Sequence, residues 1–200
     1  MVEAQDFEEV FPGIFRWEAF SPEHKVELTS HAVLLNGALY CFDPILLAHK
    51  RMVDLASRGV PKAIVLTNGN HERASEKWRE RWKVPVWTSE GAGLDQLGCQ
   101  ALPSGQASWQ EQWEIHPLEG GAPGETAFGC AELSLLIVGD AIVNLPYRRL
   151  ELLPAKYCVN RNLLEMNLRK VVVPSFERLC VAHGQTLVRG ASEAVRKLLG

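Results

Sequence analysis

The pattern of hydrophobic and polar positions predicts strands in the first third of the chain. Aromatic and apolar residues dominate from Ile14 to Phe20, which favours a strand. Two apolar runs in HAVLLNGALYCFDP flank Asn36-Gly37, and Asn-Gly is a strong hairpin signal because both residues tolerate positive φ. We therefore expect a β-meander that ends at Asp43-Pro44.

The middle of the chain alternates between helical and strand patterns. Apolar residues recur at helical spacing in two segments, and Gly59 stands where the first of these helices would be capped. Short apolar runs between and after them favour buried strands. The predicted elements are a helix over Ile45–Ser57, a strand over Ala63–Thr67, a helix over His71–Lys83 and a strand over Val84–Thr88.

The last part of the chain returns to strands and closes with two helices. Pro, Ser, Gly and Gln over Leu102–Gln110 favour a loop, and Asn160 or Asn162 is a suitable cap for the helix that follows the strands. The strands are predicted over Gln112–Leu118, Thr126–Phe128, Leu133–Val138 and Leu179–Ala182, and the helices over Asn162–Val173 and Ala191–Leu199. Two sheets flanked by helices, in one domain over residues 1–200, fit this order.

Composition narrows the class of protein. A chain of 200 residues can bury a core without disulfides, and a net charge of −3 does not suggest a nucleic-acid partner. The five cysteines are an odd number without a C-x-x-C pair, which favours reduced thiols in a cytosolic protein. The acidic N-terminus MVEAQDFEEV lacks the apolar core of a secretory signal, and no apolar run is long enough to span a membrane. We expect a soluble, cytoplasmic protein without a membrane or nucleic-acid partner.

Unusual polar residues stand just past the ends of predicted strands or in the turns beyond them. Asn68, Asn70, Glu72 and Arg73 follow the strand that ends at Thr67. The other members are Glu125 in the turn GGAPG, Asp140 after LLIVG, and His183 after LCVA. Sheets hold such positions rigidly, and binding groups favour them, so we expect the four groups to converge on one cleft.

These segments resemble the motifs of the metallo-β-lactamase-fold hydrolases. That family has T-H-x-H-x-D-H after a strand, then P-G-H-T, then G-D, then G-H-G near the C-terminus. The matching segments here are TNGNHER, APGETAF, IVGDAIV and VAHGQT, in the same order. LLNGALYCFDP also resembles the family's early strands, which usually close with an Asp. The resemblance extends from about Phe11 to the C-terminus and implies an α/β fold, a four-layer αββα sandwich.

The resemblance implies that most metal ligands of the family are replaced. The two first His of the motif fall on Asn68 and Asn70, and the His of P-G-H-T falls on Glu125. These three make up the family's first metal subsite, and the Asn amide oxygen is a poor ligand for zinc. In the second subsite the motif's Asp falls on Glu72, its last His on Arg73, the bridging Asp on Asp140 and the C-terminal His on His183.

Glu72, Asp140 and His183 could still hold one divalent ion, Zn, Fe or Mn, with open positions for water. Arg73 argues against even this ion, because a cation among the ligands repels a metal or replaces it by pairing with Glu72, Glu125 or Asp140. Each residue taken alone also fits an ordinary structural role. Asn70 would cap the helix after a turn, and Glu72 would lie in its first turn.

Two further groups lie near these positions. His71 occupies a variable position of the motif and is counted with the binding residues of the cleft, although a surface position at a helix N-terminus is the expectation for it. Tyr147, Arg148 and Arg149 could line the mouth of the cleft and meet an anionic ligand, although solvated loop charges are the simpler interpretation. Asp43 and His116 are expected to support the site or the fold.

Two functional hypotheses follow. The favoured one is an inactive or atypical hydrolase homologue that has lost most of its two-zinc site and uses the old cleft to bind a small molecule or a protein. The alternative is a hydrolase of esters, thioesters or lactones that uses one divalent ion at Glu72, Asp140 and His183. The sequence selects no substrate and leaves the oligomeric state open, a homo-oligomer included.

Overall fold

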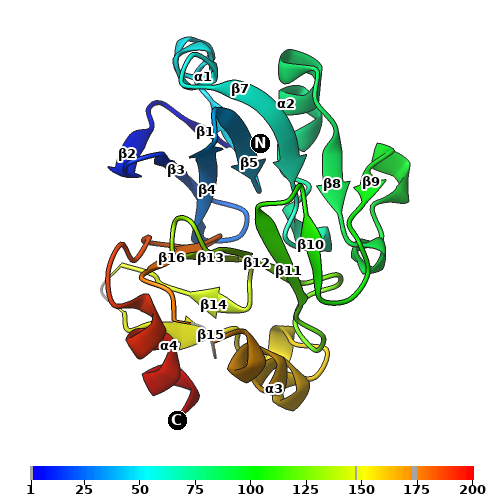
Figure 1. Cartoon of the computed structure of the whole chain (residues 1–200), viewed down its shortest axis with the longest axis vertical. Coiled ribbons are helices and arrows are strands. Elements are labelled where there is room, and N and C mark those ends of the chain that lie inside the picture. The colour runs from blue at the N-terminus through cyan, green and yellow to red at the C-terminus, as the bar shows by residue number, and fades with distance from the viewer. Residues whose placement is uncertain (1, 147, 173–174) are drawn as a thin grey trace.

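The computed structural model describes residues 2–146, 148–172 and 175–200. Its main feature is a pair of β-sheets that lie face to face (Figure 1). The larger sheet combines the N-terminal meander with three parallel additions at its β5 side. Its strands, in spatial order, are β2 (Glu8–Phe11), β3 (Ile14–Ser21), β4 (Val26–Leu35), β5 (Ala38–Phe42), β7 (Val60–Val65), β8 (Val86–Thr88) and β9 (Gln100–Ala101).

The second sheet is built from the C-terminal half of the chain. Four of its strands form an antiparallel series, and the last strand adds to it in parallel. In spatial order these are β10 (Ala107–Trp109), β11 (Trp113–Pro117), β12 (Thr126–Cys130), β13 (Leu135–Val138) and β16 (Arg178–Val181). Two small pairs complete the strands: β1 (Glu3–Ala4) with β6 (Leu46–Leu47), and β14 (Ile142–Val143) with β15 (Glu151–Leu152).

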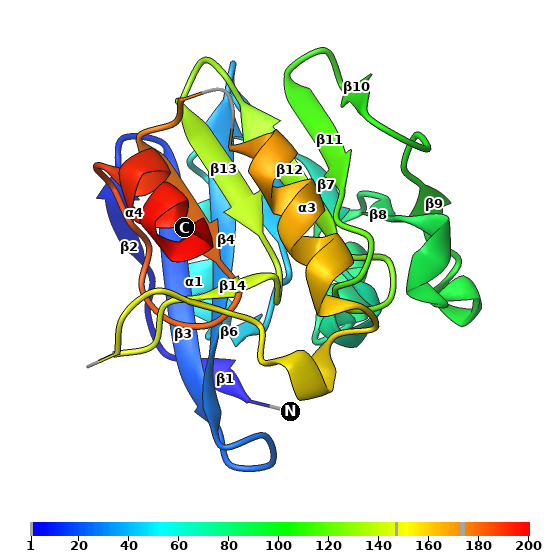
Figure 2. The ribbon, with the colours of Figure 1, turned by 90° about the horizontal axis from the view of Figure 1, so that it is seen from below.

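Helices cover the outer face of each sheet (Figures 1 and 2). Short 3-10 turns lie in the connections. The helices are α1 (His49–Ala56) and α2 (Ser75–Trp82) on the larger sheet, and α3 (Arg161–Val171) and α4 (Ala191–Leu199) on the smaller one.

Three buried hydrophobic layers separate these four layers of structure. Alternate residues of one strand serve different layers, because successive side chains point to opposite faces. In β5, Leu39 and Cys41 pack toward α1 and α2, whereas Tyr40 and Phe42 pack between the sheets. In β13 the same alternation sends Leu136 toward α3 and α4. This arrangement is the predicted αββα sandwich.

The predicted hairpin is confirmed, and two predicted helices begin later than expected. Asn36 and Gly37 both have positive φ, 49° and 79°, as the Asn-Gly turn requires. The helix predicted from Ile45 begins only at His49, because Leu46 and Leu47 pair with β1 as strand β6. An apolar run at helical spacing also fits a strand when a partner strand is present.

The second late helix matters for function. Residues Gly69–His71 form a separate 3-10 turn, and α2 begins at Ser75. Arg73 has a φ of 43°, which interrupts the helical backbone between the turn and α2. The predicted loop over Leu102–Gln110 also contains a strand, β10, and Asn160 rather than Asn162 caps α3 by accepting a hydrogen bond from the Leu163 N–H.

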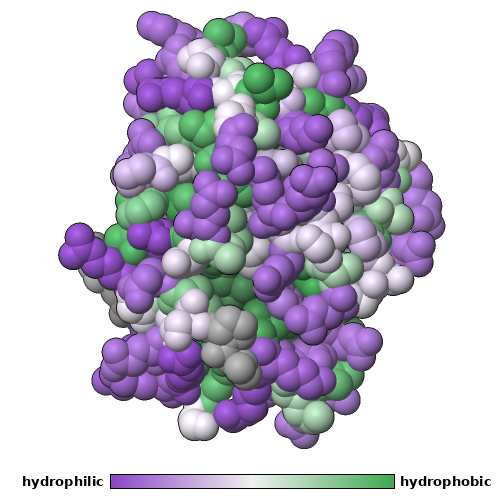
Figure 3. Space-filling model, viewed as in Figure 1, coloured by the Kyte–Doolittle hydropathy of each residue, from purple (hydrophilic) through white to green (hydrophobic). Residues whose placement is uncertain are grey.

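The surface in Figure 3 carries hydrophobic side chains scattered between polar ones, without a broad apolar area on that face. Among the residues described, none of the helices combines the length and the apolar character needed to cross a membrane.

Candidate metal centre

The functional candidates gather where strands of both sheets end. Asp140 and His183 follow β13 and β16, which are parallel neighbours, so both side chains leave the sheet at the same edge. Asp43 follows β5 and Thr67 follows β7, which are also parallel neighbours. The two sheets meet here, since the Thr29 N–H donates to the Ala182 carbonyl at 2.9 Å. The structure brings Asn68, Glu125, Asp140 and His183 into contact with one another, although only Asp140 and His183 of these line the cleft described below.

Glycine at position 139 allows this close approach of the sheets. A side-chain carbon there would collide with the Thr67 hydroxyl, the Asn68 amide and the Glu125 carboxylate. The Gly-Asp pair of the sequence therefore has a steric reason as well as a chemical one.

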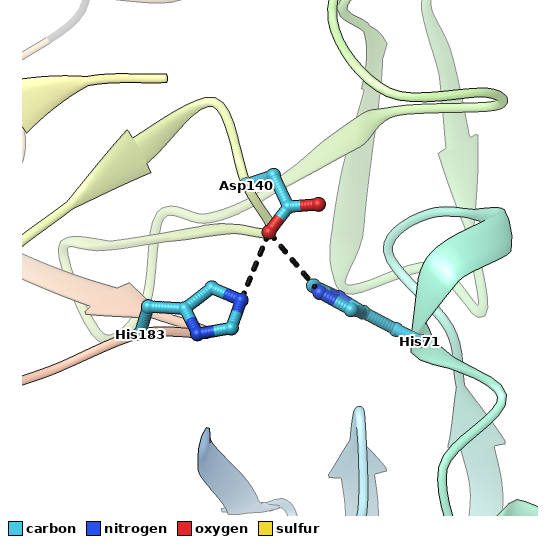
Figure 4. A group of neighbouring side chains, drawn as sticks. All are labelled: His71, Asp140 and His183. Carbon is cyan, nitrogen blue, oxygen red and sulfur yellow. Dashed lines mark ion pairs between the residues drawn. The ribbon is translucent and has the colours of Figure 1, made fainter. Parts of the chain in front are cut away.

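Three side chains form the centre of the site (Figure 4). Nε2 of His71 lies 3.2 Å from Oδ1 of Asp140, and Nε2 of His183 lies 3.0 Å from the same oxygen. Their potential ligand atoms all lie within 4.8 Å of one another. We call this group the open subsite, because all three residues line a cleft of about 600 Å³.

The other ring nitrogen of each histidine faces a hydrogen-bond acceptor. Nδ1 of His71 lies 3.0 Å from Oδ2 of Asp43, and Nδ1 of His183 lies 3.0 Å from the Glu27 carbonyl oxygen. An N–H at each Nδ1 satisfies these contacts, which leaves the lone pair of each neutral imidazole at Nε2. Two imidazole lone pairs and a carboxylate oxygen then face one another, so the group requires a cation: protons on the rings or a metal ion.

The position of Asp43 is itself fixed. Its Oδ1 accepts a hydrogen bond from the Thr67 N–H at 2.8 Å, and its Oδ2 accepts one from the Thr67 hydroxyl at 2.6 Å. A carboxylate that orients a histidine in this way is the usual support of a metal ligand. Asp43 was expected only to support the site or the fold, and its contact with His71 gives it a definite role.

The charges of the open subsite depend on one another. Burial would lower the pKa of His71, but the Asp43 and Asp140 carboxylates outweigh burial and raise this pKa to about 9. Burial opposes ionisation of Asp140, yet the His71 charge and hydrogen bonds from both histidines hold the pKa of Asp140 well below its usual range. Without a metal, His71 is therefore an imidazolium at neutral pH. A metal ion would displace its Nε2 proton.

Asn68 and Glu125, two of the three residues that the resemblance assigns to the family's first subsite, are joined to each other and to Asp140 by hydrogen bonds. The Asn68 amide nitrogen donates to Oε2 of Glu125 at 2.8 Å and to Oδ2 of Asp140 at 3.2 Å. Oε1 of Glu125 accepts from the Ala141 N–H at 3.1 Å, and Asn68 and Glu125 are 0% and 3% exposed. We call this group the closed subsite. Burial and the nearby Asp140 raise the pKa of Glu125, so its proton is held more tightly than that of an ordinary carboxyl.

Arg73 was expected to pair with the carboxylates of the site, but the structure places its guanidinium elsewhere. Its guanidinium donates to the carbonyl oxygens of Thr29 at 2.7 Å, Asp43 at 2.9 Å and Ala182 at 3.1 Å. These carbonyls belong to three separate segments from both sheets, so Arg73 ties together the backbone on either side of the open subsite. The objection that Arg73 would occupy the metal position therefore does not hold.

Two expectations for the TNGNHER segment are wrong. Glu72 is exposed and is not part of the open subsite, whereas His71 is 3% exposed and takes the place predicted for Glu72. Asn70 is also exposed at the rim of the cleft, and Asn68 rather than Asn70 caps the turn by accepting a hydrogen bond from the Asn70 N–H at 2.9 Å. Arg148 lies at the mouth of the cleft, as predicted, and Tyr147 lies outside the described residues.

A sequence signal for His71 exists in retrospect. Asp43 ends a buried strand beside the strand that leads into TNGNHER, and a buried carboxylate needs a charged or hydrogen-bonding partner. His71 is the residue of that segment best able to supply one.

The two imidazoles and the carboxylate fit a divalent ion such as Zn²⁺, Fe²⁺ or Mn²⁺. Oδ2 of Asp140 is occupied by the Asn68 amide, so Asp140 offers one oxygen to the open subsite. Two nitrogens and one oxygen leave coordination positions free for water or substrate.

Comparisons with known proteins identify the fold. Neither a family model nor a curated protein matches the sequence. Among solved structures, the chain is similar to TMB-1, with a TM-score of 0.73 and 14% identity over 100% of both chains. It is similar to the DIM-1 metallo-beta-lactamase, with a TM-score of 0.74 and 14% identity over 98% of this chain and 97% of that one. It is also similar to a metallo-beta-lactamase from Pontibacter korlensis, with a TM-score of 0.72 and 13% identity over 97% of this chain and 98% of that one. The chain therefore has the metallo-β-lactamase fold, as the motifs implied.

Proposed function

We propose that this protein is a metal-dependent hydrolase with a single divalent ion, held by His71, Asp140 and His183. One observation carries the proposal. Two histidines, each with its Nδ1 facing an acceptor, direct Nε2 at the same carboxylate oxygen on the wall of a cleft. The fold supports the same assignment, because the structures it resembles are metallo-beta-lactamases.

The chain's own residues would divide the work as follows. Asp43 and the Glu27 carbonyl orient the two imidazoles, and the Asn68 amide holds the second oxygen of Asp140 away from the ion. A divalent ion in this position lowers the pKa of bound water and polarises a carbonyl group. The closed subsite has no room for a second ion while Asn68 joins Glu125 to Asp140, so the proposal involves one ion.

A binding protein without catalysis is the second candidate. The raised pKa of His71 favours it, because the imidazolium can neutralise Asp43 and Asp140 without a metal. The two candidates differ in what fills the open subsite: protons in the binding protein, a metal ion in the hydrolase.

Metal analysis of protein purified without chelator separates them. We expect about one equivalent of metal per chain, lost in Asp140→Ala and in His183→Gln. His116→Ala is the matched control, because His116 is a buried histidine of β11 outside the open subsite. Thermal unfolding of each variant confirms that it is folded. Protein that carries no metal and takes up no Zn²⁺, Mn²⁺ or Fe²⁺ on titration would contradict the proposal.

Metal-loaded protein is then assayed with a panel of esters, thioesters and lactones. We expect His183→Gln to lose hydrolysis together with the metal. His116→Ala should keep both. Metal uptake without hydrolysis of any of the three classes would contradict the assignment as a hydrolase of this type.

A further inference from the structure

We infer that the cleft accepts an uncharged substrate with an aliphatic acyl chain, which extends away from the open subsite along the cleft walls. This inference rests on the proposed function and narrows its substrate class. It concerns the part of the cleft that surrounds the three central residues.

The walls of the cleft are predominantly apolar. They come from strand β4 on one side and from the segment after Asp140 on the other, so residues more than a hundred positions apart in the chain face the same space. The volume of about 600 Å³ suits a small molecule rather than a single ion or water. The apolar lining residues are Val26, Leu28, Val143, Leu145, Leu153 and Tyr157.

These side chains are available to a ligand to different degrees. Leu153 is 7% exposed and forms part of the wall, whereas Tyr157 is 60% exposed, which is unusual for a large side chain with an apolar ring. Leu145 and Val26 are partly buried. An aliphatic chain placed between them would remove the remaining apolar surface from water, which favours binding.

The two arginines at the cleft already have partners within the chain. Arg148 lies 3.9 Å from Glu151, whose backbone is held beside Val143 by the pairing of β14 with β15. Arg73 directs its guanidinium at three backbone carbonyls. Among the described residues that line the cleft, His24 on the β3–β4 turn is the remaining basic side chain beyond the central histidines. A carboxylate on the distal part of a substrate would lose its hydration against the apolar walls. Arg148, the one arginine that it could reach there in the described part of the chain, is a solvent-exposed side chain that already pairs with Glu151.

The two parts of the cleft therefore suit the two parts of an acyl compound. The open subsite lies at the polar end, where the carbonyl of an ester, thioester or lactone would be placed. The apolar walls continue from there toward Tyr157, where an alkyl chain would lie. A substrate with a charged tail fits this arrangement poorly.

Binding of uncharged amides tests the inference without relying on turnover. The probes are N-methylalkanamides with acyl chains from propanoyl to decanoyl, measured by calorimetry with the protein as purified. We expect the affinity to rise about threefold to fourfold with each added methylene until the cleft is filled. The mono-N-methylamide of suberic acid has the same head group and a carboxylate at the end of an acyl chain of the same length, and we expect it to bind at least about tenfold more weakly than N-methyloctanamide.

Variants locate the chain within the cleft. Val26→Thr keeps the size of the side chain and adds a hydroxyl, so it should weaken the dependence of affinity on chain length, as should Leu145→Asn. Val159→Thr is the control, because Val159 is 78% exposed and does not line this cleft. Glu151→Gln should strengthen binding of the carboxylate probe, because it leaves Arg148 without its partner.

The outcomes separate this inference from the proposed function. Metal uptake together with affinities that do not depend on chain length, or with tighter binding of the charged probe, overturns the substrate class alone. Affinity that depends on chain length in a protein that takes up no metal overturns the hydrolase and leaves a binding cleft for apolar chains.

Discussion

The closed and open subsites share one residue, Asp140, but the two oxygens of its carboxylate have different kinds of partner. At Oδ2 the Asn68 amide donates a hydrogen bond, and the same amide also donates to Glu125. At Oδ1 the carboxylate meets two histidine Nε2 atoms whose rings are held at Nδ1 by other acceptors. The first arrangement is complete without any added group. The second is complete only with protons or a metal ion.

This difference is the physical basis of the single ion in the proposed function. A side chain that donates two hydrogen bonds can hold two carboxylates together, as a bridging cation would, although it carries no charge of its own. Burial and the nearby Asp140 raise the pKa of Glu125 despite the hydrogen bond from Asn68, because an uncharged amide compensates negative charge less well than an ion. The predictions below test whether the two subsites are as independent as their hydrogen bonds suggest.

Loss of Arg73 should have the largest effect, because it supports the open subsite from outside. Arg73→Met removes hydrogen bonds to three carbonyls from both sheets and should lower the free energy of unfolding by about 3–5 kcal/mol. Arg81→Met, on the exposed side of α2, should change it by less than about 0.5 kcal/mol. Denaturant titration measures both, and equal values would contradict the role assigned to Arg73.

Asn68→Ala should break the closed subsite and leave the open one able to bind metal. Glu125 and Asp140 lose their shared donor in a buried position, so we expect a loss of about 2–3 kcal/mol in the free energy of unfolding. Metal affinity should fall by about tenfold at most, because Asn68 contacts only the Asp140 oxygen that faces away from the open subsite, whereas both imidazoles keep their Nδ1 partners. Complete loss of metal from a folded variant would mean that the two subsites act as one.

Asp43→Asn should weaken the open subsite and leave the closed one intact. The amide holds His71 less well than a carboxylate does, so metal affinity should fall about 10- to 100-fold. Competition with a chromogenic chelator gives this affinity. An unchanged metal affinity would show that Asp43 does not orient His71.

The last prediction concerns the protons that replace a metal in the open subsite. The folded pKa of His71 is raised from 6.5 to about 9, so its stabilising contribution is complete below pH 6.5 and is lost as the pH rises through 9. Glu125, also raised, adds a loss of the same sign that begins above its ordinary pKa of 4.5. Metal-free protein should therefore become less stable from about pH 5 to pH 9, by at most about 1.4 kcal/mol per pH unit for each group.

Each part of this pH dependence can be removed separately. Glu125→Gln should abolish the part that belongs to the closed subsite, and added Zn²⁺ should abolish the part that belongs to His71. Denaturation midpoints across this pH range provide the measurement. Stability that rises over the same range would contradict both assignments.

Sequence reasoning identified the fold, the strand ends that carry the site, and four of the residues that meet there, Asn68, Glu125, Asp140 and His183. It failed within TNGNHER, where it selected Glu72 as a ligand and expected His71 at the surface. The error has a local cause. A continuous helix from His71 was expected, whereas the backbone forms a 3-10 turn and then a residue of positive φ before α2 begins.

The sequence by itself determined the layers of this protein. The spacing of apolar residues assigns strands and helices to their layers, and the Asn36-Gly37 turn fixes a hairpin through local backbone preference alone. The tertiary structure decided which residue of TNGNHER faces the cleft. The turn that buries His71 depends on Asp43 and Asp140, and Gly69 is needed because a side-chain carbon there would collide with the Ala92 carbonyl. These partners are distant in the sequence, so no local pattern could place His71 at the centre of the open subsite.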